Sequence, residues 1–71
     1  MEDLKVGTII RDNGKLGIVS SIIENAVWHD DVPLSFTKRY EIRYFDGVVA
    51  VLRHKQIERL IKEGRIEVIT K

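Results

Sequence analysis

The sequence contains no cysteine in its 71 residues, so a disulfide framework, a thiolate metal ligand and a cysteine nucleophile are all excluded. It has no apolar run near the roughly 20 residues that a membrane-spanning helix needs, and residues 1–4 lack the basic-then-apolar pattern of a signal peptide. The net charge of +1 argues against a general polyanion binder. We therefore expect a soluble, cytoplasmic protein with no membrane partner.

Chemical motifs are also scarce. The two histidines and the serines form no nucleophile–base pair at a spacing that predicts contact. His29, Asp30 and Asp31 are adjacent in sequence, and three adjacent residues rarely converge on one metal ion. We therefore expect a non-catalytic protein with no catalytic residue, no metal site and no cofactor.

The length allows a single domain, residues 1–71, with a small core, because a chain of this size buries only about 60% of its unfolded surface. Charge is distributed unevenly along it. Residues 1–37 carry a net charge of −3 and residues 38–65 carry +4, while the remaining tail is neutral. Such an asymmetry can steer an acidic partner, although scattered surface charge is the more ordinary interpretation.

Two glycine turns, Asn13-Gly14 and Asp46-Gly47, lie between apolar runs. Both sequences favour a type I′ turn, whose two central residues need a positive φ, so each predicts a β-hairpin. The first turn joins predicted strands at 6–11 and 16–23.

The first hairpin places Ile10 opposite Gly17 on one face and Ile9 opposite Ile18 on the other. A glycine inside a strand costs stability unless a bend or a close contact requires it. Because both faces carry apolar residues, we expect either a strongly bent strand covered on both sides or a bulge near Ser20-Ser21 that changes the alternation.

The second hairpin begins with a cleanly alternating strand over 40–45. A two-residue loop at Asp46-Gly47 pairs Phe45 with Val48 on the outer face. The same register puts four residues on the core face: Ile42, Tyr44, Val49 and Val51.

Residues 25–39 read as a long connection that contains the only proline and the only tryptophan. Connections of about 12–15 residues without structure of their own are uncommon and often functional. The favoured interpretation is nevertheless structural, with Trp28, Leu34 and Phe36 folded back as a lid over one end of the core.

After the second hairpin, the spacing of the apolar residues changes from that of a strand to that of a helix. Ile57, Leu60 and Ile61 form one apolar stripe, which predicts a short helix over 54–63 that packs on the sheet. Gly64 follows at a position where helices commonly end in the left-handed conformation. Ile66, Val68 and Ile69 then predict a last strand.

Two stretches carry a resemblance to a known family. The stretch from Val6-Gly7-Thr8 to Gly14-Lys15-Leu16-Gly17-Ile18-Val19 is similar to the KOW pattern, and Tyr40-Glu41-Ile42-Arg43-Tyr44-Phe45-Asp46-Gly47 is similar to a Tudor-type strand. The chain therefore resembles the SH3-like small barrels of the KOW and Tudor-like group. The resemblance implies a mostly β fold, a five-stranded antiparallel barrel with one short helix before the last strand.

The resemblance also implies a binding module. KOW-type barrels contact RNA or ribosomal and transcription proteins, and Tudor-type barrels hold a methylated side chain in an aromatic cage. The rings available for a cage are Trp28, Phe36, Tyr40, Tyr44 and Phe45. Two of them, Tyr40 and Tyr44, face the predicted core, so ordinary aromatic packing is the favoured interpretation.

Two hypotheses of function remain. The first is a small protein-binding module or accessory subunit that uses the 25–39 connection and an outer apolar face, and that face also suits self-association. Its candidate residues are Ile9, Ile18, Phe45, Val48 and Trp28. The alternative is an RNA- or DNA-binding barrel with phosphate contacts from Arg39, Arg53, Lys55 and Arg59. The near-zero net charge favours an as yet unidentified protein partner.

Overall fold

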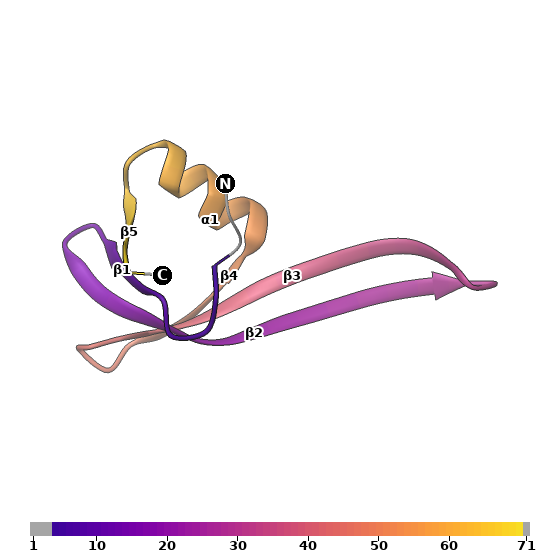
Figure 1. The fold of residues 1–71 in the computed structure, drawn as a ribbon, viewed down its shortest axis with the longest axis horizontal. Coiled ribbons are helices and arrows are strands. Elements are labelled where there is room, and N and C mark those ends of the chain that lie inside the picture. The colour runs from indigo at the N-terminus through magenta and orange to yellow at the C-terminus, as the bar shows by residue number, and fades with distance from the viewer. Residues whose placement is uncertain (1–3, 71) are drawn as a thin grey trace.

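The computed structural model describes residues 4–70, which form one antiparallel sheet and one helix (Figure 1). The elements are β1 (Ile9–Asp12), β2 (Lys15–His29), β3 (Val32–Tyr44), β4 (Val49–Arg53), α1 (His54–Lys62) and β5 (Ile66–Thr70). The strands lie in the order β4-β3-β2-β1-β5. The expected mostly β fold, with five strands and a short helix before the last one, is confirmed. The sheet order leaves β4 and β5 as edges, so closure into a barrel stays a prediction.

The first hairpin has the predicted register. Asn13 (φ 50°) and Gly14 (φ 88°) both adopt the positive φ of a type I′ turn. Ile10 pairs with Gly17 and Ile9 pairs with Ile18. However, β1 begins at Ile9 rather than at residue 6, because residues 6 and 7 form a turn.

The second hairpin differs from the prediction by one residue. Ile42 pairs with Ala50 rather than with Val51, because the loop has three residues and only Gly47 in it takes a positive φ (94°). The Gly47 N–H donates to the Tyr44 carbonyl at 3.0 Å, and the Tyr44 N–H donates to the Val48 carbonyl at 2.8 Å. This is a type I turn followed by a left-handed glycine. The prediction that Val49 and Val51 face the core is therefore wrong.

Gly17 is required by a close contact. A Cβ atom at this position would lie 3.0 Å from Ile42 Cγ2 and 3.0 Å from Tyr44 Cδ1, on the neighbouring strand β3. The predicted bulge is also present, since the β2–β3 register shifts between Val19 and Ser21. The bulge explains how β2 carries apolar residues on both faces.

The core lies between the inner face of the sheet and α1. Its buried apolar residues are Leu4, Ile10, Val19, Tyr40, Ile42, Tyr44, Ile57 and Ile66. From the helix stripe, Ile57 is fully buried, while Leu60 and Ile61 are partly buried against the same cluster. The helix packs against β3, β4 and β5. Gly64 follows it with φ 78°, as predicted.

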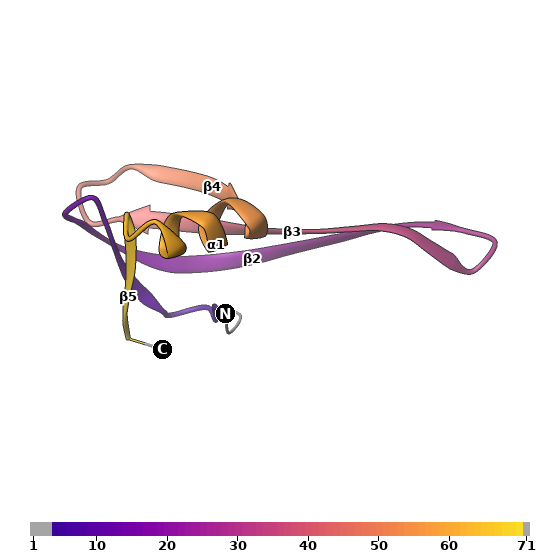
Figure 2. The same cartoon turned by 90° about the horizontal axis from the view of Figure 1, so that it is seen from above.

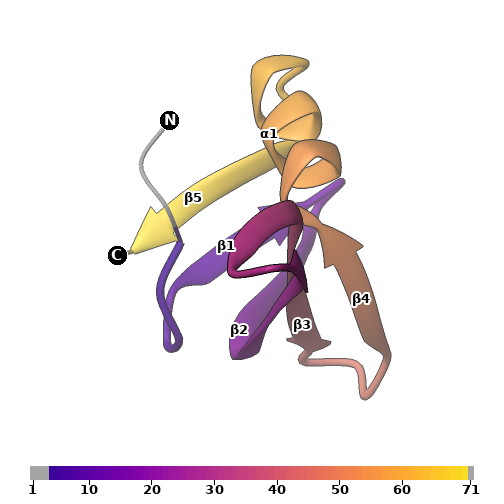
Figure 3. The same cartoon turned by 90° about the vertical axis from the view of Figure 1, so that its right-hand side faces the viewer.

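The largest departure from the sequence prediction is the segment expected to be a long connection. Residues 25–39 continue β2 and β3 as a hairpin that extends away from the rest of the molecule (Figures 1 and 2). Viewed from the tip of the arm, α1, β4 and β5 lie around the base of this hairpin (Figure 3). The molecule measures 45 × 24 × 18 Å. We refer to residues 23–39 as the arm and to the remaining described residues as the body.

Candidate functional site

The arm exposes apolar side chains that a monomer would ordinarily bury. Trp28 and Phe36 are 62% and 61% exposed, so the predicted lid over the core is wrong. Four further apolar residues of the arm are exposed: Ile23, Val27, Val32 and Leu34. Alternation along the strands distributes these six side chains over both faces of the arm, and exposed apolar side chains gathered on one segment mark a candidate interaction surface.

The turn at the arm tip explains why the hairpin forms. Asp30 (φ 48°) and Asp31 (φ 62°) both adopt the left-handed region, and His29 pairs with Val32 across them. This is a second two-residue turn of the type I′ class, and aspartate tolerates that conformation better than most residues. The available sequence signal was an Asp-Asp pair flanked by β-formers, but Pro33 two residues later suggested a break in any strand.

One face of the arm continues the inner face of the body sheet. The paired residues Ile22 and Tyr40 belong to the core side. The alternation of β2 then places Glu24, Ala26 and Trp28 on that side, because successive side chains point to opposite faces. Their partners on β3 include Lys38, opposite Glu24, and Phe36, opposite Ala26. We call this side the inner face of the arm.

A hollow of about 580 Å³ lies where the inner face of the arm meets the start of α1. It is lined by Glu24, Phe36, Thr37, Lys38, Arg53, His54 and Lys55. The volume falls within the ~300–1,000 Å³ typical of ligand pockets. Three cationic side chains and one carboxylate line it, so the hollow favours an anionic group.

The predicted basic cluster is only partly assembled at this hollow. Arg53 and Lys55 line it, whereas Arg39 lies opposite Arg53 across β3 and β4, and Arg59 lies one helical turn beyond Lys55. Like charges directly opposite each other destabilise a sheet. Among residues 4–70, Arg39, Arg53 and Lys55 form no ion pair, so this end of the body retains positive charge.

The wall of the hollow is held in place by contacts around Tyr40. The Tyr40 hydroxyl lies 3.0 Å from His54 Nδ1, and His54 Nε2 lies 3.6 Å from a Glu58 carboxylate oxygen. Lys38 Nζ lies 5.6 Å from the centre of the Tyr40 ring and 3.8 Å from Glu24. These contacts fix the start of α1 against β3 and therefore fix the shape of the hollow.

The second predicted surface, the outer apolar face, is only partly assembled and is interrupted by charge. Ile9 and Ile18 are paired and half-buried. Phe45 and Val48 are exposed in the β3–β4 loop, but the predicted pairing of Phe45 with Val48 on the outer face is wrong, because the one-residue shift places Val48 opposite Tyr44 on the core side. The register places Arg43 between Ile18 and Val49 in the same row across the sheet. Val49 and Val51, which the two-residue loop had placed in the core, are exposed on this outer face. Trp28 lies on the arm and does not join this set.

The structure does not gather the rings of an aromatic cage. Tyr40 is fully buried and Tyr44 is 9% exposed, so both belong to the core. Phe36 lies on the arm, whereas Phe45 lies beyond the other end of β3. A cation held by several rings is therefore not supported by the geometry.

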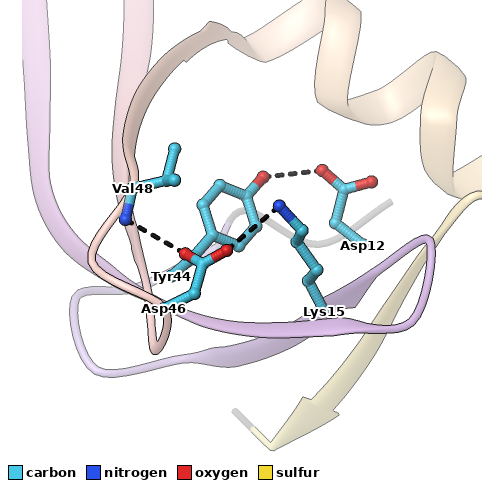
Figure 4. A network of polar contacts seen from close by, with 5 residues as sticks. All are labelled: Asp12, Lys15, Tyr44, Asp46 and Val48. Atoms are coloured by element: carbon cyan, nitrogen blue, oxygen red, sulfur yellow. Dashed lines mark hydrogen bonds and ion pairs between the residues drawn. The ribbon is translucent and has the colours of Figure 1, made fainter.

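A polar network joins the two turns at the end of the body opposite the arm (Figure 4). The Tyr44 hydroxyl donates to Asp12 Oδ2 at 2.6 Å, Lys15 Nζ lies 3.0 Å from Asp46 Oδ2, and the Val48 N–H donates to Asp46 Oδ1 at 3.0 Å. Burial and the hydrogen bond to Asp12 raise the pKa of Tyr44 well above its usual range. The Val48 N–H and Lys15 lower the pKa of Asp46. These contacts join the turn at Asn13-Gly14 to the β3–β4 loop.

Within residues 4–70 no group of three or more metal-ligating side chains comes together. His29 Nε2 does approach Asp30 Oδ2 at 3.2 Å, at the exposed tip of the arm.

The helix in the described part of the chain is too short to cross a membrane.

The exposed arm, the hollow at its base and the outer face are the three candidate binding surfaces of the described chain. Comparison with known proteins adds no assignment to them, because no protein-family model, curated protein or solved structure matches the chain.

Proposed function

We propose that this protein is a non-catalytic binding module that docks on a protein partner through its arm. The observation that carries the proposal is the exposure of Trp28, Phe36 and four aliphatic residues on a segment that contributes nothing to the core. Exposed tryptophan and phenylalanine are typical anchors of protein interfaces. A reducing, cytoplasmic setting fits the absence of cysteine.

A hairpin arm suits docking for a second reason. Strand pairing along residues 23–39, with one register shift between Val27 and Trp28, holds the backbone of the arm before any partner arrives. A preorganised segment loses less conformational entropy on binding than a disordered one, so more of its contact energy appears as affinity. This is the physical advantage of a hairpin arm over a connection without regular structure.

Site-specific photo-cross-linking in cells tests the proposal. A benzophenone amino acid replaces Phe36 on the arm, Phe45 on the outer face, or the exposed Lys62 on α1 as a control. We expect protein adducts from position 36 but not from position 62, and we expect Trp28→Ser to remove them. Adducts from position 45 alone would assign the interface to the outer face, and no adduct from either position would refute protein binding.

A second candidate function is nucleic-acid binding, which is favoured by Arg53 and Lys55 at the hollow and by the unpaired charge of Arg39 beside them. If these three and Arg59 each contact a phosphate, the log–log slope of affinity against salt is roughly −3 to −4. Titration with single- and double-stranded oligonucleotides at low salt tests it. Arg53→Glu/Lys55→Glu removes binding in this case, and no binding at low salt excludes the function.

A further inference from the structure

We propose that the partner of the arm is a second copy of this chain, with the two arms paired antiparallel about a two-fold axis so that the tip of each reaches the hollow of the other. This inference rests on the proposed function, because it names the protein that the arm binds. It draws on the charges at the two ends of the arm, on the spacing of its aromatic residues and on the size of the hollow.

The charges at the two ends of the arm are opposite. The tip carries Asp30 and Asp31, whereas the hollow at the base is lined by Arg53 and Lys55 beside the Glu24–Lys38 ion pair. A two-fold interface requires a surface that is complementary to itself. Antiparallel pairing brings each acidic tip to a basic base, while parallel pairing would place like charges together. The arm thus carries the charge pattern that antiparallel self-pairing requires.

The spacing of the aromatic residues gives the register. A two-fold axis at the Ala26–Phe36 pair brings Phe36 of the two copies together at the centre. Trp28 lies two residues from this pair toward the tip, and Glu24 lies two residues toward the base, on the same face of β2. The axis therefore places Trp28 of one copy over the Glu24–Lys38 pair of the other.

The hollow offers room for that side chain. Its volume of about 580 Å³ is within the ~300–1,000 Å³ range that accommodates a small ligand. Phe36 and the stem of Lys38 provide an apolar wall, and the cationic groups of the rim lie on the same side. With Trp28 seated there, Asp30 and Asp31, which follow it at the tip, lie on the body side of the Glu24–Lys38 pair, toward Arg53 and Lys55.

The size of the interface predicts its strength. Seven residues of strand give an arm face about 23 Å long, which places the dimer at the small end of specific interfaces, near or below about 1,200 Å² of total buried area. We therefore expect a dissociation constant in the micromolar range, and the tests extend to concentrations of several hundred micromolar.

Sedimentation equilibrium of the purified protein is the first test. We expect the wild type to dimerise with rising concentration and Trp28→Ser to remain monomeric. Phe45→Ser is the matched control, because it removes an equally exposed ring (64%) outside the arm. Trp28 is the only tryptophan, so its emission should also shift to shorter wavelength as the dimer forms. A wild type that stays monomeric throughout this range would overturn self-pairing.

Charge exchange tests the antiparallel register specifically. Asp30→Lys/Asp31→Lys reverses the tip, and Arg53→Glu/Lys55→Glu reverses the base. Each variant alone should dimerise at least tenfold more weakly than the wild type. An equimolar mixture should restore dimerisation, because both tip-to-base contacts of the mixed dimer are then of opposite charge. A mixture no stronger than the separate variants would exclude this register.

Disulfide trapping supplies a geometric test, since the chain has no cysteine of its own. Asp31→Cys mixed with Lys55→Cys should give a covalent heterodimer under mild oxidation, well above the yield of Asp31→Cys mixed with the control Lys62→Cys. Equal yields would overturn the proposal. If the protein is monomeric but position 36 cross-links to a different protein in cells, self-pairing fails and the proposed function stands. If neither occurs, both fail.

Discussion

Gly17 is the residue at which strand pairing and core packing meet. Its hydrogen atom faces Ile42 and Tyr44, and a methyl group in its place would lie at 3.0 Å from both side chains. We expect Gly17→Ala to lower the free energy of unfolding by about 1–3 kcal/mol, because an added methyl in a packed core forces its neighbours to move. Denaturant unfolding measures this loss. Val49→Ala, at an exposed strand position, is the control and should cost little; an unaffected Gly17→Ala would show that β2 and β3 separate freely here.

The environment of Tyr44 makes the stability of the fold depend on pH in the alkaline range. Its hydroxyl is held neutral by burial and by the bond to Asp12, so its pKa in the folded protein is raised above the ordinary value near 10. A group with a raised folded pKa contributes stability that is full below its unfolded pKa and is lost as the pH rises through the folded pKa. We expect the free energy of unfolding to decline above about pH 10.

The comparison with Tyr44→Phe isolates this contribution. The variant lacks the ionisable group and the hydrogen bond, so it should be less stable than the wild type at neutral pH and should lose less stability between pH 9 and pH 12. Denaturant midpoints at each pH provide the measurement. Parallel pH profiles for the two proteins would contradict the prediction.

At the scale of the structural elements, the turns determined how well the strand register could be predicted from the sequence. Asn13-Gly14 has the turn chemistry that its register demands, and the pairing of Ile10 with Gly17 followed correctly. Asp46-Gly47 favours the same class of turn, yet its loop has three residues, with Asp46 accepting a hydrogen bond from the Val48 N–H within it. A shift of one residue exchanges the two faces of a strand, which is why Val49 and Val51 were misplaced.

The apolar residues of α1 are buried to different extents, so their substitutions should cost different amounts of stability. Ile57 is fully buried in the core, whereas Leu60 is only partly buried against it. We expect Ile57→Ala to cost about 2–5 kcal/mol and Leu60→Ala to cost less, because the penalty grows with the packing lost and the cavity left. Both are measured by denaturant unfolding under the same conditions. An equal or larger loss for Leu60→Ala would mean that the helix packs on the sheet with a different face.

At the scale of the whole molecule, the candidate site could be predicted only in its parts. The charge asymmetry and the residues Arg53, Lys55 and Trp28 were visible in the sequence. The spatial arrangement of these residues could not be predicted, because it depends on residues 25–39 forming a hairpin rather than a lid. In a chain this small a buried tryptophan is the expected outcome, so the exposure of Trp28 supports the proposal that the arm is a binding surface.

The buried core and the arm occupy separate parts of the described chain. None of the buried core residues lies within the arm, and Ile23 pairs directly with Arg39 at its base. Replacing residues 24–38 with Asn-Gly should therefore close β2 and β3 with a two-residue turn and leave the core intact. We expect the free energy of unfolding to change by no more than roughly 1 kcal/mol, as for exposed substitutions elsewhere.

The shortened protein should at the same time lose every activity that the arm carries, including self-association and cross-linking to a partner. Its circular dichroism and denaturant midpoint report the fold, and sedimentation equilibrium reports association. If it unfolds, the arm stabilises the body through contacts that burial does not reveal. If it folds and still dimerises, the interface lies on the outer face around Val49 and Val51 instead, because that apolar surface is left unchanged by the deletion.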